Sequence, residues 1–167
     1  MQLYRASTTS ATVISDNTEM SVETMTSQIA CVNAPPDTVD ADLLVVPWFS
    51  GDAPSRVPGL DEAVAGELAR AIASGEFAAN LFDVFLTPIT GANWKPRRLA
   101  LIGAGKIADY NTDVARKLAT VAGMAARQRR VSHVAFLLQP GLPGPSGDID
   151  VGGLAQAGAE GLTLSEF

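Results

Sequence analysis

The chain is poor in the side chains from which metal and redox sites are built. Its 167 residues include one cysteine, Cys31, and one histidine, His133. A single cysteine excludes a disulfide within the chain, and so few nitrogen and sulfur ligands argue against a transition-metal site made by this chain alone. Cys31 lies in the apolar run 29–32, which predicts a small buried side chain. We interpret His133, near the start of a predicted strand, as a structural or surface histidine.

Basic residues are scarce as well. Lysine and arginine number 12 against 18 acidic residues, which gives a net charge of −6. Nucleic acids and anionic membranes attract basic surfaces, so this balance argues against both as partners. Two local basic clusters are interpreted as solvated rims, with a small anion-binding patch as the alternative. They are Lys95, Arg97 and Arg98, and Arg127, Arg129 and Arg130.

Long apolar runs are also missing. No run approaches the roughly 20 residues that cross a bilayer, and residues 1–20 are rich in serine and threonine and lack the apolar core of a signal peptide. We therefore expect a cytoplasmic protein with no membrane partner. Hydrophobic residues nevertheless make up 47% of the chain and charged residues only 18%, which favours one packed domain over disorder.

Hydrophobic patterning predicts an α/β domain with a mixed sheet. Residues 1–21 are expected to form a flexible arm, or at most an edge strand, and residues 22–147 the domain. Residues 88–96 are too few for a crossover helix, so the strands that flank them should be antiparallel neighbours. Residues 141–147 are typical of a Pro/Gly linker, and residues 148–167 should hold a helix that leads out of the domain. Strands are expected at 43–49, 81–87, 97–103 and 131–138, and helices at 60–74, 112–129 and 148–164.

One glycine loop could bind a nucleotide. Gly103-Ala104-Gly105-Lys106-Ile107-Ala108 follows a predicted strand and fits Gly-x-Gly-x-x-Ala, in which backbone N–H groups approach a pyrophosphate at a helix N-terminus. However, the next helix is expected only at about Thr112, and no acidic residue stands at the end of the following strand to bind a ribose. We interpret the loop as tight packing, with cofactor binding by Gly103, Gly105 and Lys106 as the alternative.

The remaining acidic residues have ordinary structural interpretations. Asp61 and Glu62 fall in the first turn of a predicted helix, where the helix dipole favours them. Asp148 and Asp150 are expected to cap the last helix. The nucleophile motif Gly-x-Ser-x-Gly is absent from the sequence. The sequence therefore assigns no catalytic residue and no metal ligand.

The order of several short motifs resembles the N-terminal domain of the leucyl (cytosol) aminopeptidases, over about residues 40–167. The motifs are Asp-Leu-Leu-Val-Val-Pro-Trp-Phe at 42–49, Ser-Gly-Glu-Phe at 74–77, Arg-Arg-Leu-Ala-Leu-Ile-Gly-Ala-Gly-Lys at 97–106, Arg-Lys-Leu-Ala at 116–119, and Ala-Gln-Ala-Gly-Ala-Glu-Gly-Leu at 155–162.

The resemblance implies a three-layer macro-like α/β domain, with a mixed central β-sheet flanked by helices. In this family two divalent ions (Zn or Mn) and the catalytic Lys and Arg belong to a C-terminal domain, which the sequence does not contain. The segment 111–116 echoes the start of the family's metal motif but lacks its Glu and Gly, so we interpret Asn111 or Thr112 as a helix cap. No catalytic or metal-binding residue of the family can be placed on this chain.

Three functions follow as hypotheses. The first is a non-catalytic N-terminal domain of a metallo-aminopeptidase, inactive alone, whose partners are its own catalytic domain and the other subunits of a homohexamer. The second is a stand-alone module that binds a nucleotide or an ADP-ribose-like ligand through the loop 103–106. The third is an accessory role in contacting DNA, which at this net charge would depend on the cluster at 127–130.

Overall fold

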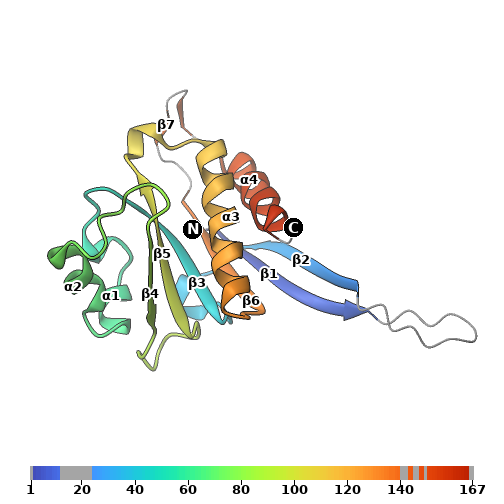
Figure 1. Ribbon diagram of the computed structural model, residues 1–167, viewed down its shortest axis with the longest axis horizontal. Helices are drawn as coiled ribbons and strands as arrows, with labels where there is room; N and C mark the ends of the chain where they lie inside the picture. Colours follow the sequence, from blue (N-terminus) through green and yellow to red (C-terminus); the bar gives the residue numbers. More distant parts are fainter. Residues whose placement is uncertain (1, 12–23, 140–142, 145–146, 149, 166–167) are drawn as a thin grey trace, which may run out of the picture.

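The computed structural model describes residues 2–11, 24–139, 143–144, 147–148 and 150–165. Within that part of the chain, six strands form one mixed sheet in the order β2-β1-β6-β3-β5-β4 (Figure 1). β3 is parallel to both β5 and β6, whereas the other neighbouring strands are antiparallel. The strands are β1 (Gln2–Ala11), β2 (Thr24–Val32), β3 (Leu43–Phe49), β4 (Val84–Pro88), β5 (Arg98–Gly105) and β6 (His133–Leu138).

Helices cover both faces of the sheet, which gives three layers. Figure 1 shows α3 (Thr112–Gln128) and α4 (Val151–Leu164) side by side, apart from α1 (Leu60–Ala63) and α2 (Glu67–Ser74). Because side chains alternate along a strand, β3 faces both layers. Leu43, Val45 and Phe49 pack with α3 and α4, whereas Leu44, Val46 and Trp48 pack with α1 and α2. The expected three-layer α/β architecture with a mixed sheet is confirmed.

The continuous apolar run of β3 is buried along its whole length, as expected for a central strand. Pro47, which cannot donate to a ladder, lies beyond Val45, the last residue that pairs with β6. The register with β5 shifts between Trp48 and Phe49. Pro47 therefore lies near the strand end and beside an irregularity, where a residue without an N–H donor is tolerated.

β4 and β5 are antiparallel neighbours, as the short connection between them predicted. The expected strand at 81–87 begins later, at Val84. The backbone of Phe82 has a φ of 71° and that of Ala79 a φ of 55°. These left-handed conformations do not fit an extended strand, so the ladder starts only after them.

The single helix expected at 60–74 is two helices. Ala65 and Gly66 adopt φ values of 57° and 78° and interrupt the helix between α1 and α2. The apolar stripe that predicted one helix still points into the core, because Leu60, Val64 and Leu68 are all buried. The apolar pattern correctly predicted which residues are buried, but it did not predict the break in the helix at Ala65 and Gly66.

The last helix packs against the sheet and α3. Leu154, Ala157 and Leu162 of α4 belong to the same core cluster as the sheet. Gly161 lets α4 approach α3, since a Cβ at this position would collide with the carbonyl oxygen of Arg116. The glycines that weaken α4 as an isolated helix thus include one that its packing requires.

The expected flexible arm at 1–21 is wrong for its first part. Gln2–Ala11 forms β1, which lies between β2 and β6 and is not an edge strand. Residues 12–23 lie outside the described residues. The sequence allowed at most an edge strand here, because the Ser/Thr-rich segment lacks an alternating apolar pattern, but backbone pairing on both sides holds β1 inside the sheet.

The linker expected at 141–147 contains a small hairpin of β7 (Pro143–Gly144) and β8 (Gly147–Asp148). The rest of that linker lies outside the described residues. Three short 3₁₀ helices complete the described elements: η1 (Pro36–Thr38), η2 (Pro54–Arg56) and η3 (Ile107–Asp109).

Candidate functional site

The strongest candidate position in this fold is the edge of the sheet where β3, β5 and β6 end. These strands run parallel, so their carboxyl ends meet at one edge, and open α/β sheets bind ligands at such an edge. The glycine loop singled out in the sequence lies there, at the end of β5. The loop after β3, which contains η2, approaches the same edge, because Ser50 N–H donates to the carbonyl oxygen of Gly105.

Gly103 is needed for packing at this edge. Its N–H donates to the carbonyl oxygen of Asp83 at 2.8 Å, and its own carbonyl accepts from the N–H of Phe82 at 2.8 Å. A Cβ at position 103 would collide with the carbonyl oxygen of Asn80. Gly103 therefore permits the segment before β4 to lie directly against β5.

Gly105 is also engaged by the chain itself. Its N–H donates to the carbonyl oxygen of Ala79 at 3.2 Å, and its φ of 69° is a conformation that favours glycine. The side chain of Lys106 is exposed. α3 begins only at Thr112, so its N-terminus is not adjacent to the loop. Because the two glycine N–H groups already have carbonyl partners, the geometry favours the packing interpretation over the dinucleotide alternative.

Beside this loop, Arg56 joins the loop after β3 to the ends of two strands. Its guanidinium donates to Asp52 and to the side-chain oxygen of Gln139, and Nη1 donates to the carbonyl oxygen of Pro47 at 3.3 Å. Gln139 Nε2 donates to the same Pro47 carbonyl oxygen at 3.0 Å. These bonds satisfy the Pro47 carbonyl at the point where β3 no longer pairs with β6.

Arg56 also stacks over aromatic rings. Its guanidinium carbon lies 4.9 Å from the Phe49 ring centroid and 5.7 Å from that of Trp48, which is cation–π geometry. Burial lowers the pKa of Arg56, although Asp52 opposes the shift. Burial disfavours the charged form of Tyr110 as well, which raises its pKa to about 12. Because the Arg56 guanidinium is bonded to three groups of the chain itself and lies over two of its rings, the cluster acts as a structural brace.

Sequence reasoning missed this brace. Arg56 and Gln139 are separated by 83 residues, and each looks like an isolated polar residue in a loop. Pro47 was the available signal, since a proline inside a buried strand leaves ladder positions to be satisfied by other groups.

The histidine lies at the opposite end of β6, away from this edge. His133 Nδ1 is 3.4 Å from Asp42 Oδ2, and the His133 backbone N–H donates to the same oxygen at 3.2 Å. Burial raises the pKa of Asp42, but these bonds and the neighbouring charges outweigh it and hold that pKa below its usual value. His133 is partly exposed and ties β6 to the residue before β3, as expected for a structural histidine.

Cys31 is exposed, which contradicts the buried side chain predicted for it. It lies on β2, the outermost strand, where an apolar run has a neighbouring strand on one side only. The two basic clusters are exposed along their whole length, which confirms that they face solvent.

The acidic residues have the structural roles expected of them, with one exception. Asp61 and Glu62 stand in the first turn of α1, and Asp61 Oδ1 also accepts from the Ala69 N–H of α2 at 2.9 Å. Asp150 caps α4 by accepting from the Gly153 N–H at 3.0 Å. Asp148, also expected at the cap, lies instead in β8.

The family follows from the sequence match. Residues 45–167 match the sequence model of the cytosol aminopeptidase family, N-terminal domain. This chain belongs to the cytosol aminopeptidase family. A probable cytosol aminopeptidase of Trichormus variabilis is 29% identical over 128 residues, which cover 75% of this chain and 25% of that protein. The chain thus spans about a quarter of the length of this relative.

Solved structures of low identity confirm the fold. A mutant of tomato leucine aminopeptidase matches 78% of the chain and 26% of its own, with a TM-score of 0.57 at 22% identity. The macrodomain of Mycobacterium tuberculosis DarG matches 80% of the chain and 88% of its own, with a TM-score of 0.56 at 12% identity. The macro-like fold implied by the resemblance is therefore observed.

The described residues of this cytosol aminopeptidase domain do not supply the set of ligands that two metal ions need. Among the described residues no group of three or more His, Cys, Asp or Glu side chains could hold an ion. In the segment that echoes the family's metal motif, Asn111 caps α3 by accepting from the Val114 N–H at 2.9 Å, and Asp113 pairs with Lys117 at 2.8 Å. Across the same described part, no helix is long and apolar enough to cross a membrane.

Proposed function

We propose that this chain is the non-catalytic N-terminal domain of a leucyl-aminopeptidase-like exopeptidase that uses two divalent ions, Zn or Mn. The observation that carries the proposal is the match of residues 45–167 to the N-terminal domain of the cytosol aminopeptidase family. The small fraction of the relative that this chain covers is consistent with a catalytic domain elsewhere in the parent protein. The parent would release N-terminal amino acids from peptides in the cytoplasm.

Within such a parent, we assign the domain to the assembly of a homohexamer and to control of access to the active site. Two features support a scaffolding role. The edge where ligands bind in open α/β sheets is filled by hydrogen bonds of the chain to itself. The Arg56 guanidinium beside it is bonded to Asp52, Gln139 and the carbonyl oxygen of Pro47, all within the same chain.

The direct test is hydrolysis of leucine p-nitroanilide by the purified chain with added Mn²⁺ or Zn²⁺. We expect no turnover above the rate of buffer with metal, while a complete cytosol aminopeptidase in the same buffer serves as the positive control. Metal-dependent turnover that grows with the concentration of this chain would contradict the proposal. The assembly role is tested separately, by comparing the sedimentation of the parent enzyme with and without residues 1–167.

A further inference from the structure

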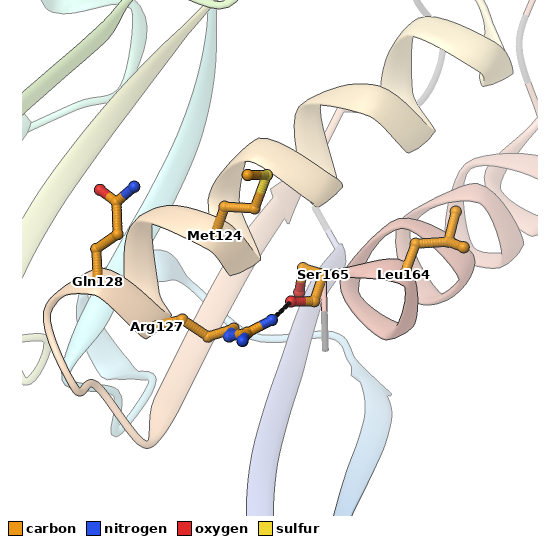
Figure 2. Close-up of a pocket in the computed structure, with 5 residues that line it drawn as sticks. All are labelled: Met124, Arg127, Gln128, Leu164 and Ser165. Atoms are coloured by element: carbon orange, nitrogen blue, oxygen red, sulfur yellow. Dashed lines mark hydrogen bonds between the residues drawn. The ribbon is translucent and has the colours of Figure 1, made fainter. Parts of the chain in front are cut away.

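A groove opens between the carboxyl ends of α3 and α4, away from the sheet edge described above (Figure 2). It has a volume of about 590 Å³ and is open to solvent, and it is lined by Met124, Arg127, Gln128, Leu164 and Ser165. Large apolar side chains are usually covered, yet Met124 is 51% exposed and Leu164 is 56% exposed. Among residues 28–139 and 150–165, for which side-chain exposure is described, these are the two most exposed large apolar side chains.

The walls of the groove are fixed by contacts between the helices. Arg127 Nη1 donates to the carbonyl oxygen of Ser165 at 2.6 Å, the bond drawn in Figure 2. Ser165 Oγ donates to the carbonyl oxygen of Leu162 at 2.5 Å. A Cβ on Gly123 would collide with Ser165, so the absence of a side chain there lets the end of α4 settle on α3. The groove is thus built into the packing of the two helices.

The charge around the groove selects an acidic partner. Arg127 lines the groove and is exposed, with one N–H bonded to the Ser165 carbonyl oxygen, and the exposed residues Arg129 and Arg130 follow it in the chain, just after α3 ends. In the described part of the chain, none of the three is within 4 Å of a carboxylate. The molecule as a whole carries a charge of −6, so a second copy would be repelled at long range. A segment with an apolar residue next to a carboxylate fits both the exposed side chains and the local charge.

We propose that the groove binds the polypeptide that follows α4 in the parent aminopeptidase. The bound segment would place an apolar side chain, flanked by Asp or Glu, in the groove. α4 ends at Leu164 and Ser165 lines the groove, so whatever follows in the chain starts beside it. Tethering of this kind raises the local concentration of the segment to the millimolar range. The inference rests on the proposed function, because it requires a following domain.

The test uses two proteins: the chain 1–167, and the long product, which is the gene product with residues 1–167 and the polypeptide that follows them. Each is made with the original sequence and with the double variant Met124→Asp/Leu164→Asp. Ile107→Asp is the matched control, since Ile107 is also an exposed apolar residue, 39% exposed, but lies at the other end of α3. We expect amide exchange at 124–128 and 160–165 to be at least roughly tenfold slower in the long product than in the chain 1–167. The double variant should abolish that difference, and Ile107→Asp should retain it.

Folding of the variants is checked on the chain 1–167 alone. Because both groove side chains are exposed, the double variant should shift its melting temperature by no more than about 2 °C. Two results would overturn the groove assignment but not the proposed function: equal amide exchange in the long product and in the chain 1–167, or equal effects of the double variant and Ile107→Asp.

If the chain 1–167 self-associates and the double variant abolishes this association, the groove binds a second copy and the assignment is overturned. A gene product that ends at Phe167, or peptide hydrolysis by the chain 1–167, would overturn the proposed function as well.

Discussion

The glycine loop at the end of β5 and the groove at the end of α4 differ in a way that sequence motifs do not reveal. The loop carries the recognisable pattern, yet its glycine N–H groups are bonded to carbonyl groups of the chain. The groove carries no motif, yet it leaves two large apolar side chains and an arginine facing solvent. A glycine pattern indicates that the backbone lies very close to another group, and here that group is the segment of the same chain before β4.

The largest expected effect comes from Gly103→Ala. The added methyl group would collide with the backbone of Asn80, which is bonded to Asp83 and so cannot move without disturbing the bonds from Phe82 and Asp83 to Gly103. We expect a loss of about 3 kcal/mol or more in the free energy of unfolding, measured by urea denaturation. Gly152→Ala is the control, because Gly152 is exposed on α4 and its nearest neighbour is the side chain of Asp150. A loop that had space for a phosphate would tolerate the methyl group, so a loss below about 1 kcal/mol would reverse the comparison.

Gly161→Ala should have the second largest effect. A methyl group here meets the backbone of Arg116, so α4 must move away from α3. We expect a loss of about 2 kcal/mol and an altered end of α4. The measurement is urea denaturation with amide exchange at residues 160–165. If α4 were a peripheral extension and not a part of the core, the substitution would raise stability, as alanine does in exposed helices.

Removal of the Arg56 brace should cost less. Arg56→Met keeps an apolar stem beside Trp48 and Phe49 but leaves Asp52 and Gln139 without their guanidinium partner. We expect a loss of about 1–2 kcal/mol, because partly buried polar groups lose their hydrogen bonds. The control is Arg70→Met, which removes only exposed ion pairs to Glu67 and Glu76 that solvent screens. Equal losses in the two variants would show that the brace is no stronger than a surface pair.

The smallest effect concerns Asp42. Its pKa is lower in the folded chain than in the unfolded chain, so the unfolded state binds the proton more tightly. The resulting stabilisation is complete above the unfolded pKa of about 3.9 and is lost as pH falls through the folded value. Asp42→Asn should therefore be less stable than the original chain at pH 7, and the difference should shrink by pH 3. Urea denaturation at the two pH values measures it, and a difference that grows in acid would have the wrong sign.

The buried elements were the predictable ones. β3 was expected from its continuous apolar run and the Thr112–Gln128 helix from its helical spacing of apolar residues, and Asn111 was recognisable as a cap. The antiparallel pairing of β4 with β5 followed from the length of the connection alone. In these places local chemistry and the global fold require the same conformation.

The misses share a different cause. β1 has a sequence without alternation and is held by two neighbours that lie elsewhere in the chain. The break between α1 and α2 falls at Ala65, whose left-handed backbone no sequence rule favours. Arg56 and Gln139 meet only once the sheet has formed. Contacts that depend on tertiary structure leave no local pattern from which they could be predicted.

The position of β1 has a consequence for the order in which the molecule can be completed during synthesis. Of the described strands, Gln2–Ala11 is made first and can pair with β2 as soon as residues 24–32 follow, but its other neighbour is β6, where Ser7 pairs with His133. Pairing between β1 and β6 therefore has to wait until residues 133–138 have been made, and closing such a distant pair is slow. Until the pair closes, β1 and the newly made β6 each offer an unpaired edge to other nascent chains. The earliest of the described strands is the one that closes this edge.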